Sequence, residues 1–99
     1  MMKFYLCKYL PPRADFLATM TTDEREWMMQ HGAYLNALLE QGLVVAHGPV
    51  IDENGGYGVS LYKIPDDQDI AAITSQDPIV QKGVGRYECY SMLHLKTRG

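Results

Sequence analysis

Residues 43–64 read LVVAHGPVIDENGGYGVSLYKI, and this stretch decides the fold because it contains two strand-like segments joined by a turn. Residues 43–47 are mostly apolar and suit a strand, and Gly48-Pro49 is predicted to end it, since proline cannot donate to a strand ladder. The segment DENGG at 52–56 has the composition of a hairpin turn, and residues 57–64 suit the returning strand. We therefore predict an antiparallel pair at the centre of the chain.

A strand is predicted near the start of the chain, at residues 3–10. Its side chains alternate, with Phe4, Leu6 and Lys8 on one face and Tyr5, Cys7 and Tyr9 on the other. Pro11-Pro12 ends the segment.

A long helix is predicted between this strand and the hairpin. Thr21 and Glu24 have the spacing of a capping box, and Gly42 supplies the residue that ends the helix. Between them, large side chains recur at spacings of three, four and seven, which places them on one face. This face consists of Trp27, His31, Tyr34, Leu35 and Leu38.

After the hairpin we predict a second helix and a last strand. The helix begins after Pro65 with Asp66 or Asp67 as its cap, and it buries Ile70 and Ile73. It ends before Pro78, because the residue preceding a proline is disfavoured in helical geometry. A loop marked by two glycines follows, and residues 87–95 form the strand.

The predicted order is β-α-β-β-α-β, which is typical of an α+β, ferredoxin-like fold with a four-stranded antiparallel sheet. The 99 residues suffice for one domain, 1–99, and not for two. Right-handed crossovers place both helices on one face of the sheet. The opposite face is also largely apolar, and soluble monomers rarely expose such a surface. We therefore expect a homodimer in which two sheets pack together.

The composition excludes several classes of function. The net charge is -3, and the nine basic residues are scattered, so the sequence lacks the basic patch that nucleic acid or an anionic membrane surface requires. The apolar N-terminal stretch is too short for a signal peptide or a membrane span, and we expect a cytoplasmic protein. In that compartment Cys7 and Cys89 are expected to be free, buried thiols.

His31 and Asp77 are the candidate catalytic residues. His31 lies on the apolar face of the long helix, where an aliphatic residue would be usual, and an imidazole titrates near ~6.5, which suits proton transfer. Asp77 precedes Pro78 at a helix end, and a carboxylate that accepts one imidazole N–H would orient the ring. The alternatives are a core histidine bonded to a backbone carbonyl and a solvated turn aspartate. Sequence alone does not place the two side chains together.

No metal or cofactor is expected. His47 and His94 lack the spacing of a metal motif, and the serines lack a nucleophile elbow. Trp27 lies one turn before His31 and either belongs to the core or forms a wall of a pocket.

The segment 77–84, DPIVQKGV, resembles the Asp-Pro segment that leads to the last strand in the YCII-related family. His31, Gly42 and Gly48-Pro49 are similar as well, and the resemblance runs from Phe4 to about Leu95. It implies a ferredoxin-like fold assembled as a dimeric α/β barrel.

The resemblance also implies a catalytic pair at His31 and Asp77. We take Trp27, Gly48 and Pro49 as the candidate substrate-binding residues. One position departs from the family pattern: Met28 stands where many members have an arginine, which leaves the charge of the substrate open. Arg25 lies one turn further back on the helix.

The leading hypothesis is an enzyme that uses His31 and Asp77 for general acid–base chemistry on a small molecule, by elimination, isomerisation or hydrolysis. The alternative is a non-catalytic domain that binds or senses a small molecule, because the same fold can serve either purpose. An oxygenase-like activity is a third option that no particular residue supports.

Overall fold

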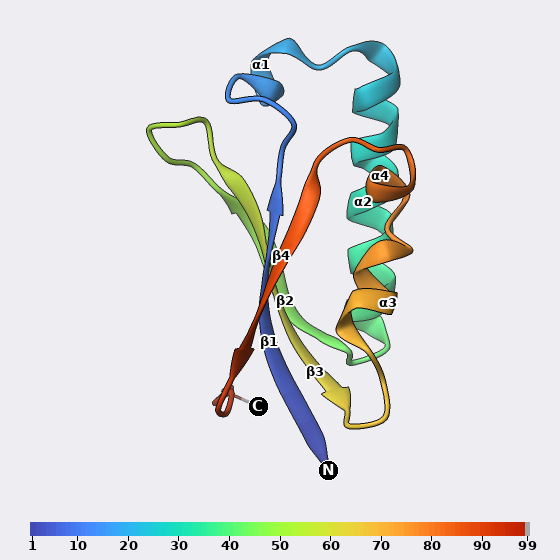
Figure 1. Ribbon diagram of the computed structural model, residues 1–99, viewed down its shortest axis with the longest axis vertical. Coiled ribbons are helices and arrows are strands. Elements are labelled where there is room, and N and C mark those ends of the chain that lie inside the picture. Colours follow the sequence, from blue (N-terminus) through green and yellow to red (C-terminus); the bar gives the residue numbers. More distant parts are fainter. Residues whose placement is uncertain (99) are drawn as a thin grey trace.

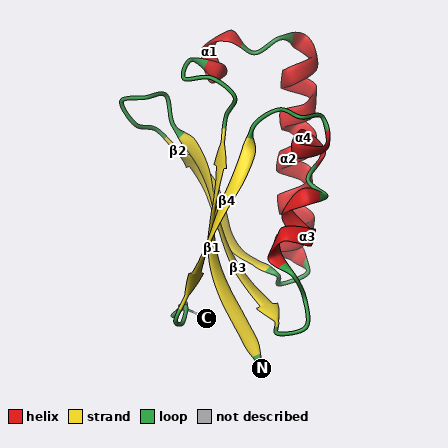
Figure 2. Ribbon diagram, viewed as in Figure 1, coloured by secondary structure: helices red, strands yellow, loops and turns green. Residues whose placement is uncertain are grey.

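The computed structural model describes residues 1–98 and confirms the predicted α+β, ferredoxin-like fold. The elements follow one another as β1 (Met2–Leu10), α1 (Phe16–Thr19), α2 (Thr22–Glu40), β2 (Val44–Val50), β3 (Tyr57–Pro65), α3 (Ile70–Ser75), α4 (Pro78–Gln81) and β4 (Arg86–Met92). The sheet has the order β2-β3-β1-β4, and each neighbouring pair is antiparallel. Helices α2, α3 and α4 lie together on one side of it (Figures 1 and 2).

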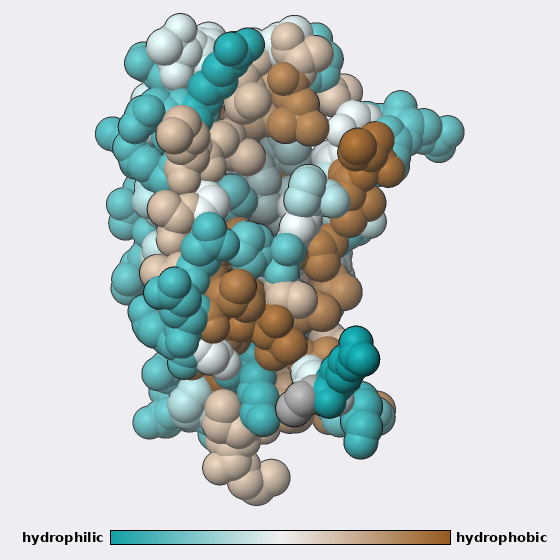
Figure 3. All heavy atoms as spheres, turned by 180° about the vertical axis from the view of Figure 1, so that it is seen from behind, coloured by the Kyte–Doolittle hydropathy of each residue, from teal (hydrophilic) through white to brown (hydrophobic). Residues whose placement is uncertain are grey.

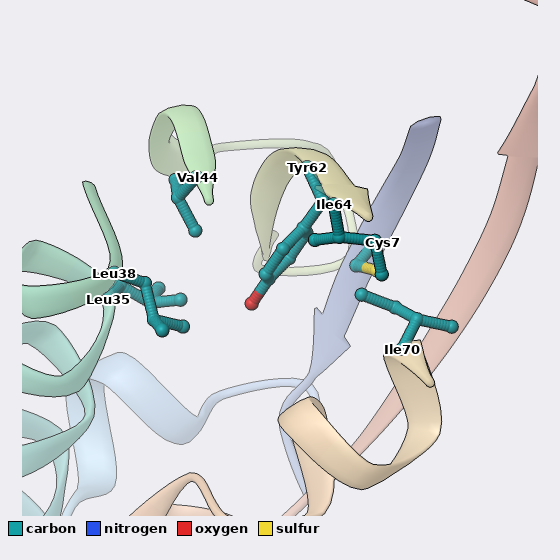
Figure 4. Packing of buried hydrophobic residues seen from close by; sticks show 7 residues of the cluster. All are labelled: Cys7, Leu35, Leu38, Val44, Tyr62, Ile64 and Ile70. Atoms are coloured by element: carbon teal, nitrogen blue, oxygen red, sulfur yellow. The ribbon is translucent and has the colours of Figure 1, made fainter. Parts of the chain in front are cut away.

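The core lies between this helical layer and the sheet. The predicted faces are confirmed: Cys7 and Tyr9 of β1 are buried, as are His31, Leu35 and Leu38 of α2. Figure 4 shows one apolar cluster at the helix–sheet contact, with Leu35 and Leu38 across from the strand residues. Its members are Cys7, Leu35, Leu38, Val44, Tyr62, Ile64 and Ile70. A second cluster, Tyr9, Phe16, Ile79 and Val84, lies toward α1 and α4.

The predicted capping box starts α2. The Thr21 hydroxyl accepts from the Glu24 backbone N–H at 3.0 Å, and the Glu24 carboxylate accepts from the Thr21 N–H at 2.9 Å. The structure adds a partner that the pattern did not reveal. Both terminal nitrogens of Arg13 donate to the Glu24 carboxylate, at 2.7 and 2.9 Å, and so connect the β1–α2 segment to the helix start.

The stability of the protein should therefore fall as Glu24 is protonated. The Arg13 guanidinium, aided by the Thr21 N–H, lowers the pKa of Glu24 from 4.5 to about 2. A carboxyl with a depressed folded-state pKa stabilises the fold above its unfolded pKa, and the contribution is lost as pH falls from 4.5 toward about 2. Glu24→Gln should remove this part of the dependence: it should be less stable than wild type at neutral pH and nearly equal in acid.

Urea denaturation across that pH range measures the effect, with Glu26→Gln as the matched control because Glu26 is exposed on the same first turns of α2. If both variants kept the slope of the wild-type profile, the ion pair at the helix start would have no role in acid stability.

Four details differ from the sequence prediction. Asp69, and not Asp66 or Asp67, caps α3, because the chain first makes a turn in which the Gln68 N–H donates to the Pro65 carbonyl. Strand β2 continues through Gly48-Pro49 to Val50; β2 is an edge strand, where a missing N–H is tolerated. The last strand ends at Met92 and does not reach Leu95. The short helices α1 and α4 were not predicted.

Within residues 1–98, the other face of the sheet carries no helix. Leu6 of β1 lies in register with Leu61 of β3 and with Tyr90 of β4, and all three point away from the helical layer. Tyr90 is 50% exposed. Viewed from behind, hydrophobic atoms gather on the strand side of the molecule (Figure 3). Among the helices within residues 1–98, none has the length and hydrophobicity needed to span a membrane.

Candidate functional site

His31 projects from α2 toward the sheet, and its imidazole meets the Asp77 carboxylate. The Nδ1 atom lies 2.6 Å from Asp77 Oδ2. His31 is only 8% exposed and Asp77 is fully buried, so the contact is shielded from bulk water. The two residues lie 46 positions apart in the chain and meet because α2 and α4 pack against each other.

The local sequence fixes the Asp77 carboxylate. Asp77 is the N-cap of α4, with Pro78 at the first helical position, an arrangement in which the side chain accepts from the helix start. Its Oδ1 accepts from the Ile79 N–H at 3.1 Å, and its Oδ2 accepts from the Tyr87 hydroxyl at 2.7 Å. With the imidazole, three donors from three elements hold this carboxylate.

This set of donors assigns the protons. A buried carboxylate that receives an O–H, a backbone N–H and an imidazole contact is stabilised as the anion, so Nδ1 is assigned as the N–H donor. The lone pair of the neutral ring then lies on Nε2. Within residues 1–98, Nε2 has no hydrogen-bond partner. In the same range, the one fully buried side-chain nitrogen or oxygen without a partner is Tyr62 Oη, so Nε2 is not fully buried. Nε2 is therefore open to a small molecule or to water.

Two tyrosines surround the imidazole. The ring centroids of Tyr9 and His31 are 5.0 Å apart, and those of Tyr87 and His31 are 6.4 Å apart. Burial raises the pKa of both phenols above the ordinary range, and the nearby Asp77 charge adds to the rise. Both hydroxyls therefore stay protonated and act as donors, Tyr9 to the Val84 carbonyl at 2.8 Å and Tyr87 to Asp77.

A cavity of about 260 Å³ opens beside His31, between α2 and the β2–β3 end of the sheet. Its walls are mostly apolar, with Phe16, Met28 and Leu35 among them, and the polar side chains that line it include those of His31, His47 and Ser60. An apolar cavity with a few convergent polar groups is the usual form of a small-molecule site.

The predicted substrate contacts divide into two groups. Gly48 and Pro49 line the cavity, because β2 continues through them instead of ending there. Trp27 does not line it; Trp27 packs against the second core cluster, and the Lys82 ammonium lies 5.8 Å from its ring centroid. Met28, which stands where the family resemblance suggested an arginine, lies on the cavity wall.

In the described part of the chain, the remaining histidines lie outside any cluster that could hold a metal. His47 Nε2 contacts Asn36 Oδ1 at 2.8 Å, and His94 lies beyond the last strand. Across residues 1–98, histidine, cysteine and acidic side chains nowhere gather in threes that could ligate a metal.

Tyr9, Tyr87 and Ser60 are site residues that the sequence alone did not reveal. Tyr9 and Tyr87 face each other across β1 and β4, two register positions from a cysteine pair, and Ser60 faces His47 across β2 and β3. The alternation of strand residues did assign Tyr9 to the face that the helices cover. What the pattern lacked was the register, which decides which end of the sheet meets His31.

Removing the Tyr87 hydroxyl should loosen the Asp77 carboxylate. Hydrogen bonds to charged groups contribute about 1.5–3 kcal/mol, and since Tyr87 is only partly buried we expect Tyr87→Phe to lower the free energy of unfolding by about 1–2 kcal/mol. Tyr90→Phe is the control, because the Tyr90 hydroxyl donates to Glu88 on the same strand in a solvent-exposed hydrogen bond. Equal denaturation midpoints for the two variants would contradict a stabilising role for the Tyr87–Asp77 bond.

Comparisons with known proteins place these features in context. The sequence pattern of a family described as "YCII-related domain" matches residues 2–94. Among solved structures, the chain is similar to 5-chloro-2-hydroxyhydroquinone dehydrochlorinase from Burkholderia phenoliruptrix, in its complex with 2,5-dihydroxybenzoquinone. The TM-score is 0.58 at 15% identity, over 91% of this chain and 94% of the other. No curated protein sequence matches.

Proposed function

This chain belongs to the YCII-related family, and from that premise we propose that it is a small-molecule enzyme in which His31 and Asp77 act as a general acid–base pair. The observation that carries the proposal is the buried 2.6 Å contact between His31 Nδ1 and Asp77 Oδ2 at the edge of a cavity. The arrangement leaves one basic nitrogen, Nε2, free to exchange a proton with a bound molecule.

In the proposed reaction, His31 Nε2 takes a proton from a hydroxyl group of the substrate. The Asp77 carboxylate stabilises the imidazolium through Nδ1 and stays ionised throughout. The imidazolium returns this proton to the ring carbon that bears the leaving group, which gives the keto tautomer and makes that carbon tetrahedral. Nε2 then takes the proton of a second hydroxyl group, and the electron pair left on that oxygen drives the departure of the leaving group with its own electron pair. The net change is the loss of one proton and one anion, which is an elimination. A positioned acid–base group of this kind contributes typically about 10²–10⁴-fold to the rate.

The cavity supports a single-ring substrate. Its volume of about 260 Å³ lies below the usual range for drug-sized ligands, so it suits a compact molecule. The apolar walls, with Phe16 and Tyr57 among them, favour a flat, apolar ring, and the polar groups suit a few hydroxyls. The structurally similar dehydrochlorinase carries a dihydroxybenzoquinone, a ring of this class. We therefore propose a hydroxylated ring that bears a leaving group.

The test uses 5-chloro-2-hydroxyhydroquinone as the substrate probe and 2,5-dihydroxybenzoquinone as the binding probe. Chloride release is measured under nitrogen against a protein-free control, and binding is followed by thermal shift. The proposal expects chloride release that saturates with substrate and depends on pH. Saturable thermal stabilisation without chloride release would assign the chain to the alternative, a ligand-binding domain. If the chain showed neither chloride release nor thermal stabilisation, the proposal of a ring-shaped ligand would be contradicted.

We further propose that the chain acts as a homodimer that joins the uncovered sheet faces. Leu6, Leu61 and Tyr90 form a row across three strands. Phe4 and Met92 lie beside this row, and the charged side chains of Lys63, Lys8 and Glu88 lie at its margins. An exposed apolar patch with a polar rim usually marks an interface, and a two-fold axis would cover both copies at once.

Sedimentation equilibrium should give a mass of twice the 11.2 kDa of one chain. Leu6→Glu should shift the protein toward the monomer, because it would bury two charges in the interface. Leu93→Glu is the control, since Leu93 is fully exposed just after β4. A wild-type monomer at micromolar concentration would rule out the sheet-to-sheet dimer.

A further inference from the structure

Cys7 and Cys89 form a pair that the proposed acid–base chemistry does not use. They stand directly opposite each other in the register of β1 and β4, on the face that the helices cover. Their sulfur atoms are 2.8 Å apart, and both are free thiols. The two residues are 82 positions apart in the chain, so the contact is a product of the fold.

The strand geometry permits a covalent bond between these sulfurs. Directly opposed residues in an antiparallel pair have Cα atoms about 4.5–5.5 Å apart, within the range of about 4.4–6.8 Å that disulfides span. Closing the bond would move the sulfurs together by about 0.8 Å, from 2.8 Å to the ~2.05 Å of a disulfide. Rotation about the two Cα–Cβ bonds is enough for such a shift, and the ladder can stay intact.

The two thiols differ in their reactivity. Cys7 is fully buried, and its S–H donates to the Cys89 sulfur, while Cys89 is only partly buried. This hydrogen bond lowers the pKa of Cys89, with the Thr74 hydroxyl adding to the effect, and it raises the pKa of Cys7 together with burial. Because the thiolate is the nucleophile, Cys89 is the sulfur that attacks the oxidant, and Cys7 is the resolving cysteine that attacks Cys89 afterwards.

We propose that Cys7 and Cys89 are a reversible redox site that takes hydroperoxides as oxidant. The Cys89 thiolate attacks one peroxide oxygen, the O–O bond breaks, and a sulfenic acid forms with release of hydroxide or alkoxide. The Cys7 sulfur then attacks the sulfur of Cys89, the S–O bond breaks, and the Cys7 proton leaves with the hydroxide as water. With hydrogen peroxide, two thiols become one disulfide and the peroxide becomes two waters.

A low-molecular-weight thiol reverses the step. Two thiol molecules reduce the Cys7–Cys89 bond by exchange through a mixed disulfide and leave as their own disulfide. The inference does not depend on the proposed elimination, because it rests on the sulfur pair alone. The link would nevertheless join the two strands that carry Tyr9 and Tyr87, one same-face position away in the register.

The test oxidises the reduced full chain with one equivalent of hydrogen peroxide. Intact mass should fall by about 2 Da, the two hydrogens lost on disulfide formation, and dithiothreitol should restore it. Trypsin should then yield a linked pair of peptides, residues 4–8 and 87–96, which contain one cysteine each. A linkage between two chains, or sulfinic acid at Cys89 without a link, would overturn the proposal.

Two variants separate the roles of the sulfurs. Cys7→Ser retains a hydroxyl donor, so Cys89 should stop at the sulfenic acid, a gain of about 16 Da that dimedone traps. Cys89→Ser leaves only the buried thiol and should not react at the same dose. Equal reactivity of the two variants would contradict the assignment of Cys89 as the attacking sulfur. The peptide map of the wild-type protein tests the Cys7–Cys89 disulfide independently of both variants.

Discussion

Replacing His31 by glutamine should lower kcat for chloride release from the chlorinated probe by about 10²–10⁴-fold. The glutamine amide can still donate to the Asp77 carboxylate and fill much of the same space, so the buried anion keeps a partner. It has no basic nitrogen to take the place of Nε2. The loss should therefore appear in kcat, while the thermal shift caused by the quinone probe should be largely retained.

His94→Gln is the matched control, because His94 is an exposed histidine beyond β4, outside the cavity. It should turn over the probe at the wild-type rate. If His31→Gln retained wild-type kcat, proton transfer by His31 would be excluded, even with the fold and the binding of the quinone intact.

Asp77→Asn should also lower the rate, by up to about 10⁴-fold, the loss that follows when the same change is made in a serine-protease triad. An asparagine amide that donates to His31 Nδ1 would move the ring proton to Nε2. The nitrogen that faces the substrate would then be a donor and no longer a base. The change also removes a buried anion that three donors stabilise, so the free energy of unfolding should fall by about 1–3 kcal/mol.

Asp69→Asn separates the two consequences. Asp69 caps α3 much as Asp77 caps α4, but no contact joins Asp69 to His31 within the described residues. Asparagine is as good an N-cap as aspartate, so this control should keep both its stability and its turnover. An Asp77→Asn variant that is folded and fully active would show that the carboxylate does not orient the imidazole.

The long helix and the β2–β3 hairpin were predictable from the sequence because they depend on local signals. The capping box at Thr21 and Glu24 and the recurrence of large side chains on one face place α2 within one or two residues of its bounds. The hairpin turn at 52–56 sets the pairing of β2 with β3. These signals act over a few residues, so a single sequence contains them in full.

The remaining details depend on contacts between distant segments. The edge position of β2 allows Pro49 to continue the strand, and nothing within residues 43–49 indicates which strands lie at an edge. Asp77 followed by Pro78 is typical both of the end of one helix and of the start of the next. The prediction used the pair only to end the preceding helix, so α4 was not predicted. The approach of His31 to Asp77 depends on the packing of α2 against α4, which the family resemblance suggested and local patterns did not.

Asp77 serves two needs with one carboxylate, since it starts α4 and also holds the imidazole of His31. Substitutions at position 77 should therefore reduce the yield of folded protein in a cell together with its activity, whereas those at position 31 should affect mainly activity. In a descendant that no longer needs the reaction, the histidine would be lost first and the aspartate retained. Relatives that keep an aspartate at position 77 but lack a histidine at position 31 would then be recognisable as proteins that have lost the proposed activity.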